Sequence, residues 1–383
     1  MLPYGRSGIS MNVKKLEERL KSVQGAEEKL EALDEVAAHC YDQDEYQKAA
    51  NFYHQAMKLV PRGNPRAYYQ GQEGICYFLL GQDKEAYQAL SVAQEMFCVD
   101  EEDFDPEIYG LVYYFLGSLY EYGGDNDASL RSRLKAIKYL SCLHREAQWM
   151  LLAGISRIYE ERGEFRESVK YNTQTISLIS DDDLEVGYIY ESLGYSHYEL
   201  GEYDKALGYF SKILQVAPEF ERKDDIFFSI GLCNQRLLNF QTALDSYLKL
   251  VEVKRLGGDQ ESLIWLFIEI THCYYSLKEH EKSLEFVEKG LQQPSQDKDE
   301  LAEINSYLTN NYHALGQFQE AAEAGEKTLE ISNEFHNIEI MLPNLALSYY
   351  QLGENDEFEF YRDWCERDFP DFSSTTQLNK LET

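Results

Sequence analysis

The sequence predicts an all-α protein, an α–α superhelical solenoid in which about nine helical hairpins are stacked. Three observations lead to this prediction. A pattern of small, aromatic and turn-forming residues recurs along most of the chain. Tyr is frequent at 30 residues while Pro is scarce at 8, which suits helices joined by short links. The chain has 383 residues, which favours several domains or a repeat array over one globular domain.

The repeating pattern is clearest at residues 187–218. A small residue, Gly194, is followed by an aromatic one, Tyr198, then by a turn at Gly201 and by Ala206 in the next helix. Weaker copies keep the same register along the chain. They predict that the first helices of successive hairpins begin near residues 30, 67, 110, 149, 187, 224, 264, 302 and 339.

Packing explains the residue types in this pattern. Small residues such as Gly194 and Ala206 are expected where the two helices of a hairpin approach most closely. Gly201 and Gly316 are expected to adopt the positive φ that ends a first helix. Tyr and Phe side chains fill the space between hairpins. Because no hairpin can bury its apolar stripe alone, neighbouring hairpins must stack.

In this pattern the chain resembles the tetratricopeptide repeat family, over about residues 30–370. The resemblance implies that the first helices line a concave groove, with the second, fifth, ninth, twelfth and thirteenth positions of each repeat facing it. Aromatic rings there supply contact area, and amides bind a partner's backbone. The expected partner-binding residues are Tyr114, Arg157, Tyr195, Tyr198, Phe228, Gln235, Arg236, His272, Tyr275, Asn310, His313 and Asn344.

The two ends of the solenoid require helices that cover its exposed faces. Apolar residues at helical spacing predict a capping helix near each end. The predicted organisation is a disordered lead at 1–11, an N-terminal capping helix at 12–24, a tetratricopeptide repeat solenoid at 25–355, a C-terminal capping helix at 356–371 and a disordered tail at 372–383.

Charge and cysteine content narrow the function classes. The chain carries 68 acidic and 36 basic residues, a net charge of −32, which repels phosphate backbones and anionic membrane surfaces. We therefore expect neither nucleic-acid nor membrane binding. The 7 Cys form no CxxC motif, and the start has no apolar leader segment. A reduced, cytoplasmic protein is expected.

The motifs of catalysis and of cofactor binding are missing from the sequence. There is no phosphate-binding glycine loop and no HExxH motif, and the 8 His are scattered. The acidic stretch 99–107 lacks the spacing of a calcium loop and is interpreted as a solvated connector. We expect no enzyme activity, no cofactor and no metal site.

One local cluster of positive charge departs from the acidic background. Arg131, Arg133, Lys135 and Lys138 lie in a stretch without acidic residues, and Arg133 occupies a position usually filled by an aromatic residue. The cluster either pairs with the acidic stretch 99–107 or forms a docking patch for an acidic partner or a second copy of the chain.

The leading functional hypothesis is a non-catalytic scaffold or adaptor that binds a peptide or protein segment in the groove. The alternative is a peptide-responsive signalling regulator of the bacterial quorum-sensing receptor type, which the long repeats resemble. A second alternative is an enzyme with an unrecognised site.

Overall fold

The computed structural model describes residues 13–181, 183, 185–257 and 263–370. Within these ranges it contains 19 α-helices and one 3₁₀ helix, and no strand. This confirms the predicted all-α class. The expected lead at 1–11 and tail at 372–383 lie outside the described residues.

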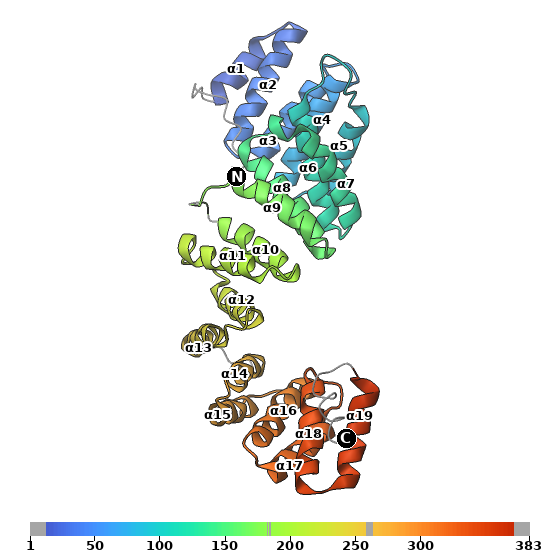
Figure 1. Ribbon diagram of the computed structural model, residues 1–383. Helices are drawn as coiled ribbons and strands as arrows, with labels where there is room; N and C mark the ends of the chain where they lie inside the picture. Colours follow the sequence, from blue (N-terminus) through green and yellow to red (C-terminus); the bar gives the residue numbers. More distant parts are fainter. Residues whose placement is uncertain (1–12, 182, 184, 258–262, 371–383) are drawn as a thin grey trace. The chain divides into compact units, whose positions relative to one another are not determined.

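Two compact units divide the chain, residues 1–200 and 201–383. In both units the helices follow one another as antiparallel pairs (Figure 1). The helices of the first unit are α1 (Val13–Ser22), α2 (Ala26–Asp42), α3 (Tyr46–Met57), α4 (Asn64–Leu79), α5 (Asp83–Met96), α6 (Pro106–Tyr122), α7 (Asn126–Ala136), η1 (Ile137–Cys142), α8 (Arg145–Glu161), α9 (Phe165–Leu178) and α10 (Val186–Glu199).

The second unit continues the pairing from α12 onward. Figure 1 shows α12, α14 and α16 in one layer and α13, α15 and α17 in the other. Its helices are α11 (Tyr203–Val216), α12 (Lys223–Arg236), α13 (Phe240–Gly257), α14 (Ile264–Ser276), α15 (His280–Leu291), α16 (Lys298–Ala314), α17 (Phe318–Ile331), α18 (Ile338–Leu352) and α19 (Asn355–Asp368).

The turn inside each consecutive pair has the same backbone signature. One residue with positive φ separates the two helices, as expected for Gly201 and Gly316. Among the described residues, nine such turns follow one another from α2 to α19, in agreement with the predicted number of about nine. The nine turn residues are Asp44, Gly81, Gly124, Gly163, Gly201, Leu238, Lys278, Gly316 and Gly353.

Small residues allow the two helices of a pair to approach closely. A Cβ atom on Gly231 of α12 would lie 2.2 Å from Cε1 of Tyr247 in α13. Tyr247 is fully buried and is the largest such side chain described. Here a small and an aromatic residue meet inside one hairpin, whereas the aromatic residues were predicted to fill the space between hairpins. Apolar clusters extend from there into the neighbouring hairpins.

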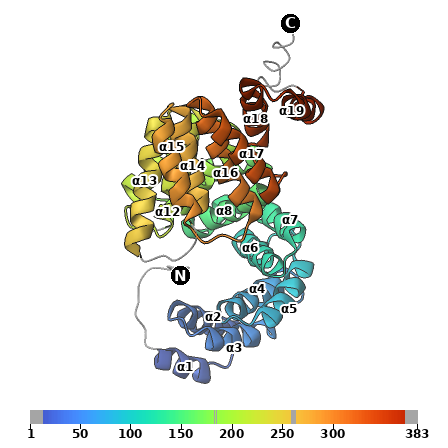
Figure 2. The same ribbon diagram turned by 90° about the horizontal axis from the view of Figure 1, so that it is seen from below.

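Both predicted capping segments contain a helix. α1 covers most of 12–24 and packs against α2, while residue 12 lies outside the described residues. α19 covers most of 356–371 and lies beside α18, as both Figure 1 and Figure 2 show, so it is also the second helix of the ninth pair. The capping roles themselves stay predictions.

Candidate functional site

Polar side chains join the first helices of successive hairpins in the second unit. Each hydrogen bond spans nearly one repeat along the sequence, from one first helix to the next or to the link before it. The partners and donor–acceptor distances of this polar ladder are Gln235–Glu269 at 2.8 Å, His272–Tyr307 at 3.0 Å, Asn337–Glu303 at 2.9 Å, Asn344–Asn310 at 2.8 Å and His313–Ser348 at 2.9 Å.

The residues of the first three of these hydrogen bonds line a pocket of about 310 Å³. The volume lies at the lower end of the range for ligand sites, which is about 300–1,000 Å³. The pocket is bounded by α12, the turn that follows it, the first residue of α13, α14, α16 and the link that precedes α18. The residues lining it are Leu232, Gln235, Arg236, Leu238, Phe240, Ile268, Glu269, His272, Glu303, Tyr307, His336 and Asn337.

A chain of hydrogen bonds holds one side of the pocket. Tyr247, buried in α13, donates its hydroxyl hydrogen to Oε1 of Gln235 at 3.2 Å. Nε2 of Gln235 donates to Oε2 of Glu269. On α16, the hydroxyl of Tyr307 lies 3.0 Å from Nδ1 of His272. The polar groups of the pocket are therefore oriented by buried neighbours.

The two carboxyl groups of the pocket are harder to ionise than exposed ones. Burial raises the pKa of Glu269, against the opposing effects of Gln235 and Arg236. Burial, and then the charge of Glu269, raise the pKa of Glu303 to about 7. Burial also lowers the pKa of His272, so this imidazole is uncharged at neutral pH.

Glu303 makes stability depend on pH in a defined direction. Its pKa rises from 4.5 to about 7 on folding, so the folded chain holds this proton more tightly than the unfolded chain. The stabilisation is complete below about pH 4 and is lost as pH rises towards about pH 7. We expect Glu303→Gln to raise the denaturation midpoint at about pH 8 and to change it little at about pH 5. Equal shifts at both pH values would contradict this.

Three predicted groove residues, Gln235, Arg236 and His272, meet in this pocket. The other predicted residues of the second unit lie outside the pocket lining. Phe228 is half-buried against Trp265 with ring centroids 4.8 Å apart, and Tyr275 is half-buried. Asn310 is 1 % exposed, so the prediction that it faces a partner is wrong in this structure. Its neighbours on the ladder, His313 and Asn344, are partly buried.

The predicted groove residues of the first unit occupy different environments. Tyr195 is 44 % exposed and lies edge-on to Phe165, so it is accessible to a partner. Tyr198 is partly buried. The hydroxyl of Tyr114 donates to Sδ of Met150 at 3.6 Å, across two first helices.

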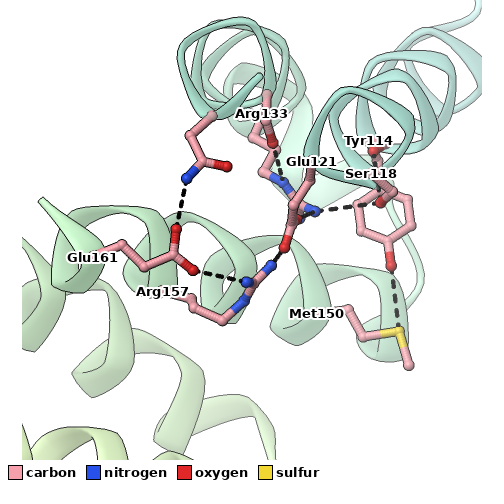
Figure 3. A network of polar contacts seen from close by, with 9 residues as sticks. Tyr114, Ser118, Glu121, Arg133, Met150, Arg157 and Glu161 are labelled. Atoms are coloured by element: carbon pink, nitrogen blue, oxygen red, sulfur yellow. Dashed lines mark hydrogen bonds and ion pairs between the residues drawn. The ribbon is translucent and has the colours of Figure 1, made fainter. Parts of the chain in front are cut away.

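Arg133 belongs to a buried network, not to a surface patch (Figure 3). Its side chain is 5 % exposed. Nη2 donates to Oε2 of Glu121 at 2.6 Å and to Oγ of Ser118 at 3.3 Å, and Nε donates to Oγ of Ser129 at 3.3 Å. The prediction that Arg133 serves in docking is therefore wrong, because its guanidinium points between helices.

Arg157 completes this network from α8. It forms ion pairs with Glu121 and, at 3.0 Å, with Glu161, while half of its side chain remains exposed (Figure 3). Glu121 thus receives one buried and one half-exposed guanidinium. Arg157 is accessible on one side, although much of its charge is compensated.

The rest of the basic cluster is exposed. Arg131 and Lys135 lie on α7, and Nζ of Lys135 lies 4.7 Å from the ring centroid of Tyr113. Lys138 follows in η1 rather than in the same α-helix.

The acidic stretch 99–107 makes contacts within the first unit. Asn64 donates to Asp103 at 3.0 Å, and Asp105 caps α6 by accepting from two backbone N–H groups.

Comparisons with known proteins agree with this architecture. The family model described as tetratricopeptide repeat matches residues 187–220, which is the segment where the sequence pattern is clearest. Residues 187–220 therefore form a tetratricopeptide repeat, and the chain has the fold of a tetratricopeptide repeat solenoid.

Similar proteins extend the likeness beyond one repeat. Outer dynein arm-docking complex subunit 4 from Homo sapiens is 27 % identical over 166 residues, and the Mus musculus protein is equally similar. The match covers 42 % of this chain and 24 % of the human protein, so it spans about a quarter of that relative's length. The structure of the apo form of RapI matches with a TM-score of 0.51 at 14 % identity, covering 92 % of this chain and 97 % of RapI. That likeness concerns the fold alone.

The tetratricopeptide repeat fold is a scaffold for protein–protein interaction, and this coarse function agrees with the leading hypothesis.

Across the described ranges, no helix is long and apolar enough to cross a membrane. In the same ranges, no three His, Cys, Asp or Glu side chains gather closely enough to hold a metal ion. Five of the seven Cys are buried, and all seven are free thiols.

The acidic side of the pocket was not predicted from the sequence. Glu303 falls at the second position of its tetratricopeptide repeat, so the register itself could have identified it. Glu269 lies one position from a predicted groove site. His336 and Asn337 stand in a link between hairpins, where the helical register makes no prediction.

Proposed function

We propose that this chain is a non-catalytic adaptor that binds a peptide or protein segment along the face formed by its first helices. The observation that carries the proposal is the pocket of about 310 Å³ in the second unit. It lies on the face where the resemblance to the family predicted a partner, and it joins side chains from successive hairpins. A bound segment would contact several repeats at once.

The named relative supports a protein partner. Outer dynein arm-docking complex subunit 4 is, by its name, a subunit of a docking complex. The match covers only part of that protein, so the likeness supports an adaptor role without naming the partner. The quorum-sensing alternative stays a prediction, since the similarity to RapI concerns the fold alone.

Selection of peptides on the full chain tests the proposal. We expect a phage-displayed library of random peptides to yield sequences that bind the wild-type protein. Leu232→Trp should weaken these peptides at least about tenfold, because the indole occupies the pocket that Leu232 lines. Binding is measured by fluorescence anisotropy with labelled peptides.

The matched control adds the same side chain elsewhere in the second unit. Lys249 is exposed on α13, a second helix, so Lys249→Trp should leave binding unchanged. Thermal unfolding of both variants checks that each is folded. The proposal fails if no peptide is enriched, or if Leu232→Trp and Lys249→Trp bind the peptides equally well.

A further inference from the structure

The pocket of the second unit carries more negative than positive charge. Glu269 on α14 and Glu303 on α16 both line it, and the one arginine or lysine in its lining is Arg236 on α12. His272 adds no charge at neutral pH, because burial lowers its pKa. Above about pH 7, where Glu303 is ionised, a cationic group entering the pocket would therefore meet two carboxylates and one guanidinium.

Each carboxylate is held in place but retains capacity for a ligand. Glu269 accepts one hydrogen bond from Gln235, and Glu303 accepts one from Asn337, at 2.8 Å and 2.9 Å. A carboxylate has about four lone-pair sites, so each could accept further N–H groups. The amides fix the direction of the carboxylates without neutralising them.

We propose that this pocket receives the basic side chain, a lysine or an arginine, of a segment bound along the first helices. This inference rests on the proposed function and specifies the chemistry of its ligand. An ammonium or guanidinium group would donate charge-assisted hydrogen bonds to Glu269 and Glu303, which are stronger than bonds between neutral groups. The stem of the side chain would pack on Leu232, Ile268 and Phe240, which also line the pocket.

The electrostatics of the pocket agree with this occupant. Burial raises the pKa of Glu303 to about 7, and the nearby charge of Glu269 adds to this effect, so a positive charge placed between the two carboxyl groups would favour their ionised forms. A bound cation would supply that charge. An anionic ligand would face both carboxylates, and an apolar side chain would remove water from them without offering a hydrogen bond.

The test begins with acetylated peptides selected on the wild-type chain, and it compares each basic peptide with a copy carrying norleucine or citrulline at its lysine or arginine. We expect the basic residue to improve affinity about tenfold or more. The improvement should shrink to less than about threefold on the double variant Glu269→Gln, Glu303→Gln. The control is Glu288→Gln, Glu330→Gln, which removes the same two charges from exposed positions of the second unit.

Dependence on pH supplies a second readout. The charged and titratable groups around Glu303 are Glu300 on α16, Glu269, His272 and Tyr307 beside the pocket, Arg236 on α12, Glu339 on α18 and His336 in the link. Affinity for a basic peptide should increase from about pH 6 to about pH 8 as Glu303 ionises. Glu303→Gln should remove most of this increase.

The outcomes separate the inference from the proposed function. If peptides bind and Leu232→Trp blocks them, but basic residues make no difference, the inference is overturned and the adaptor remains. If the benefit of a basic residue is equal on the Glu269, Glu303 variant and on its control, general attraction to an acidic chain explains it and the inference is again overturned. If no peptide binds, both fail.

Discussion

Arg133→Met is expected to lower the free energy of unfolding of the first unit by about 3 kcal/mol. Methionine fills most of the same volume but leaves Glu121, which is 12 % exposed, without its buried guanidinium. Removing one member of a buried ion pair typically costs about 3–5 kcal/mol. The lower end applies because Arg157 still pairs with Glu121 from the solvent side.

A double variant distinguishes this explanation from a loss of packing. Replacing a buried ion pair with apolar residues is often neutral, so Arg133→Met, Glu121→Met should recover most of the stability. Arg131→Met, on the exposed side of the same helix, should stay within about 0.5 kcal/mol of the wild type. Chemical denaturation, followed by the fluorescence of Trp149 with Trp265 and Trp364 replaced by Phe, measures each variant.

The structure also explains how an arginine side chain fits at position 133. A Cβ atom on Gly154 of α8 would lie 2.0 Å from Nη1 of Arg133, so this glycine leaves the space that the guanidinium occupies. If Arg133→Met alone proved neutral, the network of Figure 3 would contribute nothing measurable to stability.

The fold followed from the sequence because its determinants are local and repeated. The paired small and aromatic residues, such as Gly231 and Tyr247, meet within one hairpin, and the turn residues Gly201 and Gly316 adopt positive φ as expected. Leu238 and Lys278 make the same turn without being glycine. The positive φ of this turn therefore does not require glycine.

Burial of polar groups could not be predicted in the same way. Arg133 looked like a surface cation because sequence alone does not show that Gly154, 21 positions later, leaves room for it (154 − 133 = 21). Asn310 was expected on the groove, but the ladder bond from Asn344 turns it into an internal contact. Whether a polar side chain faces a partner or another repeat depends on the stagger between hairpins.

The pocket illustrates this stagger. Gln235, Glu269, Glu303 and Asn337 follow one another at intervals of 34 residues (269 − 235, 303 − 269 and 337 − 303). The hydrogen bonds join the first two and the last two of these residues. The interval was present in the sequence, yet it falls at different positions of successive helices, since the links between hairpins differ in length.

Gly231→Ala is expected to lower the free energy of unfolding of the second unit by about 1–3 kcal/mol, the usual cost of overpacking. The new Cβ would lie 2.2 Å from Cε1 of Tyr247, a fully buried ring that must move. That movement also disturbs the pocket, because Tyr247 holds Gln235 and Gln235 holds Glu269. Peptides that occupy the pocket should therefore bind more weakly to this variant.

Gly208→Ala provides a matched control on the neighbouring helix α11. Gly208 is exposed, and a Cβ atom there would meet nothing within 4 Å. Alanine favours a helix over glycine by up to about 1 kcal/mol, so this change should stabilise the chain. Chemical denaturation should thus show changes of opposite sign in the free energy of unfolding for Gly231→Ala and Gly208→Ala.

A companion variant, Gly231→Ala with Tyr247→Leu, should lose less stability than the two single changes added together, because the smaller side chain leaves room for the new methyl group. Equal shifts at Gly208 and Gly231 would mean that helix propensity, and not the close contact with Tyr247, determines the effect.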